Sequence, residues 1–65
     1  MQTISKVKRM RLKLNLTQRQ LAKLVGVKPP TVNLIERRGI YNTLTARKYA
    51  AAMKVSPILL LEGLD

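Results

Sequence analysis

The 65 residues suffice for one small domain, residues 1–65, and the 46% of apolar residues exclude a disordered tail. Thirteen Lys and Arg against three Asp and Glu give a formal net charge of +10, which favours a polyanionic partner, nucleic acid first. Because the sequence has no Cys and no His, it excludes disulfides, thiolate nucleophiles and the usual Cys/His zinc sites, and we expect no enzyme, cofactor or metal.

The first predicted element is a basic amphipathic helix, residues 4–14. Its apolar residues recur at intervals of three and four, and we expect this stripe to face the core. They are Ile4, Val7, Met10 and Leu14. Asn15 follows and tolerates the left-handed conformation, so the helix is expected to end there.

A second, short helix is predicted for residues 18–25. Thr17 supplies a capping oxygen before it, and Gly26 follows it, where a positive φ is easiest for glycine. Leu21 and Ala22 lie on its inward face.

Two prolines predict the start of a third helix. Proline is tolerated only in the first turn, which places Pro29 and Pro30 there, and Gly39 ends the helix. Its inward apolar residues are Val32 and Ile35, with Leu34 beside them.

A fourth helix follows a loop over residues 40–42. Either Thr43 or Thr45 can cap it. Its inward residues at helical spacing are Ala46, Tyr49, Ala50 and Met53. Ser56 and Pro57 then open a short fifth helical turn that runs through residues 58–61 to Gly63, so the prediction is a compact, all-α bundle of five helices.

The second and third predicted helices have the arrangement of a helix-turn-helix, in which the second of two short helices enters the major groove of DNA. This geometry needs a small residue where the helices cross, which Ala22 supplies, and an unencumbered turn, which Gly26 supplies. The apolar residues that lock the pair are Leu21, Val25, Val27, Val32 and Ile35.

In this region the chain resembles the DNA-binding domains of phage Cro and repressor proteins. The matching pattern reads Thr17-Gln18-x-x-Leu21-Ala22-x-x-x-Gly26-Val27-x-x-x-x-Val32-x-x-Ile35-Glu36. The likeness extends back to Arg11 and forward to Gly63. It implies a five-helix fold, recognition by the third helix, and a repressor of transcription that binds double-stranded DNA as a dimer, with half-sites about one helical turn apart.

The resemblance also implies where DNA is bound. The implied DNA-binding positions are Gln18, Lys28, Pro29, Pro30, Thr31, Asn33, Leu34, Arg37 and Arg38. Gln18 resembles the family's phosphate contact at a helix N-terminus, Asn33 can bind adenine with two hydrogen bonds, and Lys28 suits guanine or phosphate. Alternatively, each of these side chains is ordinary solvent-exposed surface.

Two further features concern the framework of the motif. In relatives a pair at the positions of Arg11 and Glu36 links the first helix to the end of the third, a structural role. The chain departs from the family at Pro29 and Pro30, where relatives carry polar residues that touch base edges. Prolines donate no hydrogen bond, so they either pack on thymine methyl groups or lose the readout there.

The C-terminal leucines exceed what one helical turn can bury, which favours a homodimer through this region over a simple cap on the core. They are Leu59, Leu60, Leu61 and Leu64.

Other functions remain open at this point. The basic first helix also suits an anionic membrane surface, although such a peptide does not need the Ala, Gly and capping pattern of the second and third helices. Antitoxins and restriction-controller proteins share the same domain. No apolar run approaches the ~20 residues of a membrane span, so we expect a cytoplasmic protein of a bacterium or phage, associated with the nucleoid.

Overall fold

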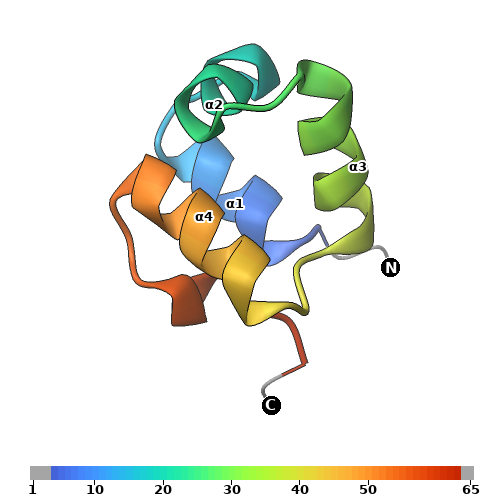
Figure 1. Cartoon of the computed structure of the whole chain (residues 1–65), viewed down its shortest axis with the longest axis vertical. Helices are drawn as coiled ribbons and strands as arrows, with labels where there is room; N and C mark the ends of the chain where they lie inside the picture. Colours follow the sequence, from blue (N-terminus) through green and yellow to red (C-terminus); the bar gives the residue numbers. More distant parts are fainter. Residues whose placement is uncertain (1–3, 64–65) are drawn as a thin grey trace.

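Four α-helices and one 3-10 turn build the part of the chain that the structure, a computed structural model, describes: residues 4–63. The elements are α1 (Lys6–Lys13), α2 (Gln18–Val25), α3 (Pro29–Arg38), α4 (Thr43–Met53) and the 3-10 turn η1 (Pro57–Leu59). α2 packs against both α3 and α4, α1 packs against α3, and η1 packs against α4 (Figure 1). The all-α prediction is confirmed, but the predicted count of five helices is wrong, because these residues form four.

The second helix has the bounds that its flanking residues indicated. Thr17 Oγ1 accepts a hydrogen bond from Gln20 N at 3.0 Å, and Gln20 Oε1 accepts one from Thr17 N at 2.8 Å. These bonds satisfy backbone donors that a first turn otherwise leaves free. Asn15 before the helix and Gly26 after it have the predicted left-handed φ values of 60° and 90°. Both ends of α2 are therefore fixed by local chemistry.

α3 begins at the two prolines and ends before Gly39, as predicted. Val32 is fully buried, but Leu34, which we expected beside it, is 41% exposed. Two residues along an α-helix correspond to a rotation of roughly 200°, so the two side chains lie on nearly opposite faces. The inward assignment of Leu34 was wrong.

α1 is shorter than predicted, which leaves two apolar residues outside it. Ile4 precedes the capping residue Ser5, and Leu14 follows the last helical residue. They are 42% and 40% exposed. Val7 is fully buried and Met10 packs against the core, so only the middle of the predicted stripe faces inward.

The cap of α4 is Asn42, and neither of the two predicted threonines. Its Oδ1 accepts hydrogen bonds from Leu44 N at 2.7 Å and Thr45 N at 3.1 Å. The reason is position: Asn42 has extended backbone angles immediately before the helix, whereas Thr43 is already inside it. The four inward residues predicted for α4 are all buried.

The fifth helix is reduced to the single turn η1 because the chain after it turns inward. Leu60 is fully buried, and Leu61 forms an isolated parallel β-bridge with Ile40. Glu62 N donates to Ile40 O at 2.8 Å, which holds this segment in an extended path. Of the predicted exposed leucines, Leu59 is 49% exposed, and Leu64 lies outside the described residues.

Candidate nucleic-acid interface

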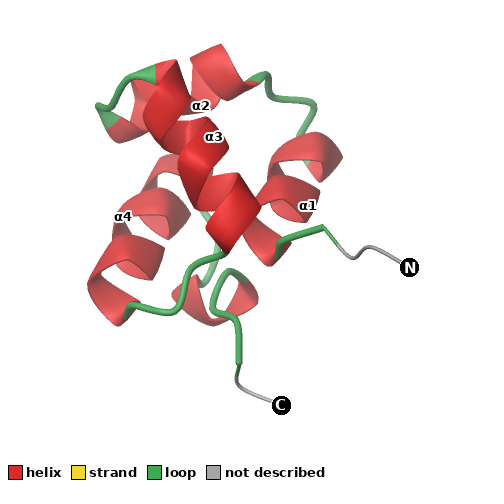
Figure 2. Cartoon of the chain, turned by 90° about the vertical axis from the view of Figure 1, so that its right-hand side faces the viewer, coloured by secondary structure: helices red, strands yellow, loops and turns green. Residues whose placement is uncertain are grey.

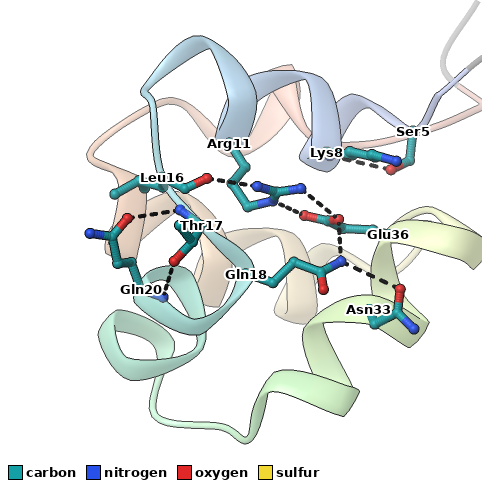
Figure 3. A network of polar contacts seen from close by, with 9 residues as sticks. All are labelled: Ser5, Lys8, Arg11, Leu16, Thr17, Gln18, Gln20, Asn33 and Glu36. Atoms are coloured by element: carbon teal, nitrogen blue, oxygen red, sulfur yellow. Dashed lines mark hydrogen bonds and ion pairs between the residues drawn. The ribbon is translucent and has the colours of Figure 1, made fainter.

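A buried ion pair joins α1 to the last turns of α3 (Figure 3). Arg11 Nε donates to Glu36 Oε2 at 2.5 Å, and Arg11 Nη2 donates to Oε1 at 3.3 Å. Arg11 Nη1 donates to the carbonyl oxygen of Leu16 at 2.6 Å, which ties down the loop before α2. The side chains of the pair are only 9% and 2% exposed. This pair therefore holds α1, α3 and the loop before α2 together.

Gln18 extends this network to the surface. Its Nε2 donates to Glu36 Oε1 at 2.9 Å and to Asn33 Oδ1 at 3.4 Å, and Figure 3 shows its side chain between the two. Since a carboxylate only accepts hydrogen bonds, the amide nitrogen of Gln18 has to face Glu36. Both of its hydrogens are then used, and Oε1 is the part of the amide without a bond in this network. No local pattern predicts this contact, because Gln18 and Glu36 are 18 residues apart.

The crossing of α2 and α3 has the features of a helix-turn-helix. Ala22 is 1% exposed at the crossing, and its carbonyl oxygen accepts from Gly26 N at 2.8 Å and Val27 N at 2.9 Å. A Cβ on Gly26 would meet no atom within 4 Å, so glycine is needed there for its positive φ and not for space. This turn ends α2 abruptly and brings α3 across it.

The outer face of α3 is open to solvent, and α3 lies in front of the other helices in Figure 2. All eight predicted DNA-binding residues around α3 are exposed: Lys28, Pro29, Pro30, Thr31, Asn33, Leu34, Arg37 and Arg38. Four of them, at the spacing i, i+3, i+4 and i+7, form one stripe, which we call the α3 stripe: Pro30, Asn33, Leu34 and Arg37. The stripe combines an amide, a guanidinium group and apolar surface.

The first turns of α2 and α3 differ in what they offer an anion. Pro29 and Pro30 have no N–H, and Thr31 N donates to Lys28 O at 2.9 Å, so the start of α3 offers few backbone donors. At the first two positions of α2 the N–H groups have no intrahelical acceptor. The backbone donors for an anion therefore lie at the start of α2.

The family model described as Helix-turn-helix matches residues 7–60, which run from the first buried residue of α1 to the buried Leu60. The chain belongs to the Cro/C1-type helix-turn-helix family. As a member of this family it is a DNA-binding regulator. A search of the curated proteins and a search of the solved structures gave no significant match.

In this helix-turn-helix protein, α2 and α3 are the two helices of the motif, as predicted, and both lie within the matched residues. Residues 4–63 contain no helix that is long and apolar enough to cross a membrane. In the same part of the chain no three His, Cys, Asp or Glu residues are grouped so that they could hold a metal ion.

Proposed function

We propose that the protein is a sequence-specific transcriptional repressor, without enzymatic activity, that inserts α3 into the major groove of an operator. The observation that carries the proposal is the α3 stripe, an uncovered helical face held in place by the buried pair of Arg11 and Glu36. An α-helix fits the major groove, where each base pair presents a distinct pattern of donors and acceptors. A regulator of this kind acts in the cytoplasm of a bacterium, on the bacterium's own DNA or on that of a phage.

Asn33 is the proposed base reader. Its Oδ1 accepts from Gln18, which leaves both hydrogens of Nδ2 and one lone pair of Oδ1 for DNA. That combination suits the N7 acceptor and N6 donor of adenine. Because Glu36 orients Gln18 and Gln18 orients Asn33, the ion pair also supports the reading group.

The phosphate contact at Gln18 is proposed for its backbone N–H and not for its side chain. Phosphate oxygens only accept hydrogen bonds, and both amide hydrogens of the side chain are used inside the protein. The N–H groups of Gln18 and Arg19 at the start of α2 suit a phosphate, and the positive end of the helix dipole supports this. Lys28 at the start of α3 and Arg37 and Arg38 at its end add exposed positive charge around the motif.

The two prolines are proposed to make apolar contact with thymine methyl groups, since they have no N–H to donate. Pro30 belongs to the α3 stripe together with Leu34, so the stripe has a continuous apolar part. Such a surface favours thymine without a hydrogen bond to it.

We also propose that two copies bind one operator through the C-terminal region. Tyr41 and Leu44 are each 71% exposed, and the Tyr41 ring lies 3.6 Å from the place where a Cβ of Gly63 would be. Tyr41 therefore lies beside the C-terminal segment, and both side chains are open to contact with a second copy. Because each copy has a net charge of +10, free copies repel one another, and we expect the dimer to form on DNA, which neutralises this charge.

Selection of bound sequences from a random pool of duplexes tests the proposal. The expected consensus has two half-sites related by two-fold symmetry and about one helical turn apart. If the protein bound DNA without enriching any sequence, the proposal of a sequence-specific repressor would be wrong, and the protein would be a non-specific DNA-binding protein.

A further inference from the structure

An open hollow of about 270 Å³ lies between α1 and η1. It is lined by Lys6, Arg9, Met10, Lys13, Ile58 and Leu59, which we call the α1–η1 groove. In Figure 1, η1 and α3 lie at opposite sides of the molecule. The groove is therefore not part of the surface proposed for DNA.

The four α1 residues of the groove are spaced by three and four positions, so they share one face of the helix. Val7 and Arg11, on another face, are the buried residues of α1. The groove face thus has three positive side chains around Met10, which itself packs against the core, and the three cations border the opening to solvent.

The floor of the groove is apolar and held in position. Ile58 and Leu59 are 62% and 49% exposed, because the next residue, Leu60, occupies the core instead of them. Glu62 Oε2 accepts a hydrogen bond from Lys6 N at 2.7 Å, which attaches the C-terminal segment to the start of α1. This bond therefore holds the two sides of the groove, α1 and the C-terminal segment, next to each other.

We propose that the α1–η1 groove binds an acidic, amphipathic segment of another protein. Apolar side chains of that segment would contact Met10, Ile58 and Leu59, and its carboxylates would pair with the surrounding Lys and Arg. Charge complementarity selects this occupant, since groups of opposite sign across an interface favour both encounter and register. Apolar burial against the floor supplies the affinity that exposed ion pairs alone do not give.

A second copy of the chain fits the groove poorly. The sequence has three acidic residues, of which Glu36 is buried against Arg11 and Glu62 is bonded to Lys6 N. DNA fits poorly as well, because its phosphates could pair with the cations but would leave the apolar floor unused. The segment and an operator can bind at the same time, so the groove would bring an acidic partner protein to DNA.

The test uses a fluorescent, helical 14-residue peptide with leucines on one face and glutamates on both sides of them. The peptide is titrated into the protein alone and into the protein bound to duplex DNA. We expect binding in both cases, with amide chemical-shift changes confined to the groove. A control peptide with serine in place of leucine should bind at least about tenfold more weakly, because it lacks the apolar contact.

Two variants of the groove and one matched control complete the test. Arg9→Glu and Ile58→Ser should each weaken the peptide about tenfold, and since both side chains are exposed, we expect both variants to fold. Lys48→Glu makes the same charge change on the exposed surface of α4 and should change the affinity less than about twofold. Circular dichroism checks the fold of each variant, and Leu59→Ser replaces Ile58→Ser if the latter does not fold.

Several results would overturn the proposal. Equal affinity for the leucine and serine peptides would mean that only net charge attracts the peptide. Groove signals that shift with protein concentration alone would assign the groove to a second copy, and groove signals that shift on addition of duplex would assign it to DNA.

Discussion

Glu36 performs two tasks with one carboxylate, since it pairs with Arg11 and orients Gln18. Its Oε1 accepts from both Arg11 Nη2 and Gln18 Nε2, so a change at this residue alters the core and the DNA-binding surface together. A buried pair of this kind need not add net stability, because desolvation of the charges offsets their attraction. The loss of one partner, however, leaves the other charge buried and unpaired.

We therefore predict that Glu36→Gln lowers the free energy of unfolding by about 3–5 kcal/mol, because it leaves the charge of Arg11 without compensation. The double variant Arg11→Met with Glu36→Leu removes both charges and should recover most of this loss. Urea denaturation of the three proteins measures the difference. If the double variant is no more stable than Glu36→Gln, the unpaired charge is not the cause.

Tyr49 has a buried hydroxyl group for which the described residues offer no hydrogen-bond partner. Burial raises the pKa of Tyr49 above its ordinary value of 10.0, and the negative charge of Glu36 raises it further. The folded protein therefore favours the neutral phenol more than the unfolded chain does. The resulting stability is complete below pH 10 and is lost as the pH rises from there through the raised pKa.

Tyr49→Phe tests this reasoning, because it removes an unpaired hydroxyl group and the ionisation together. We expect the variant to be at least as stable as the parent at pH 7, by up to about 1 kcal/mol, since no hydrogen bond is lost. Above pH 10 its advantage should grow. Thermal unfolding of both proteins from pH 7 to pH 11 provides the comparison, and a less stable variant at pH 7 would show that the hydroxyl group has a partner.

At the scale of helices, the elements that could be predicted from the sequence are those whose ends carry local signals. α2 was predicted with its observed bounds because Thr17 and Gly26 mark both of its ends. The cap of α4 was missed because three neighbouring residues, Asn42, Thr43 and Thr45, are all able to cap, and only the backbone path decides among them. A single turn forms in place of a fifth helix because Leu61 pairs with Ile40 in a β-bridge, and no local pattern predicts this pairing.

Some features of the candidate site could likewise be predicted from local patterns in the sequence, and others could not. The exposed residues of α3 follow from helical periodicity and from the helix-turn-helix pattern. The bonds of Gln18 to Glu36 and Asn33 connect residues 18 and 15 positions apart, on different helices. These bonds depend on the angle at which α2 crosses α3, which no local sequence pattern specifies. Because they use both hydrogens of the Gln18 side-chain amide, the backbone N–H of Gln18 is the donor that is left for a phosphate.

The α3 helix carries the prediction about specificity. Asn33→Ala should relax the preference for one base pair in each half-site by about 1–3 kcal/mol, because it removes the proposed hydrogen bonds to a base. If Arg37 contacts phosphate, Arg37→Gln should lower the affinity for all DNA sequences by a similar factor. Binding to a panel of singly substituted operators separates the two effects. Equal loss across the panel for Asn33→Ala would mean that Asn33 does not read a base.

At the scale of the whole molecule, the two proposed surfaces lie on different sides of one small framework. The α3 stripe is an open helical face, and the α1–η1 groove is formed where the C-terminal segment meets α1. The buried pair of Arg11 and Glu36 connects the two helices that carry these surfaces, because Arg11 belongs to α1 and Glu36 to α3. The net charge of +10 favours association at both surfaces, since each is proposed to bind a negatively charged partner.

The last prediction concerns this charge and the binding of DNA. If a dimer makes roughly 6–10 phosphate contacts, the logarithm of the binding constant should fall against the logarithm of salt concentration with a slope of about −5 to −9. Replacing one contact in each subunit, as in Arg37→Gln, should reduce the magnitude of the slope by about 2, whereas Lys48→Gln on α4 should leave it nearly unchanged. Fluorescence anisotropy with operator DNA between about 50 and 200 mM salt provides the data. A flat response would contradict phosphate neutralisation as the main source of affinity, and equal slopes for the two variants would remove Arg37 from the DNA contacts.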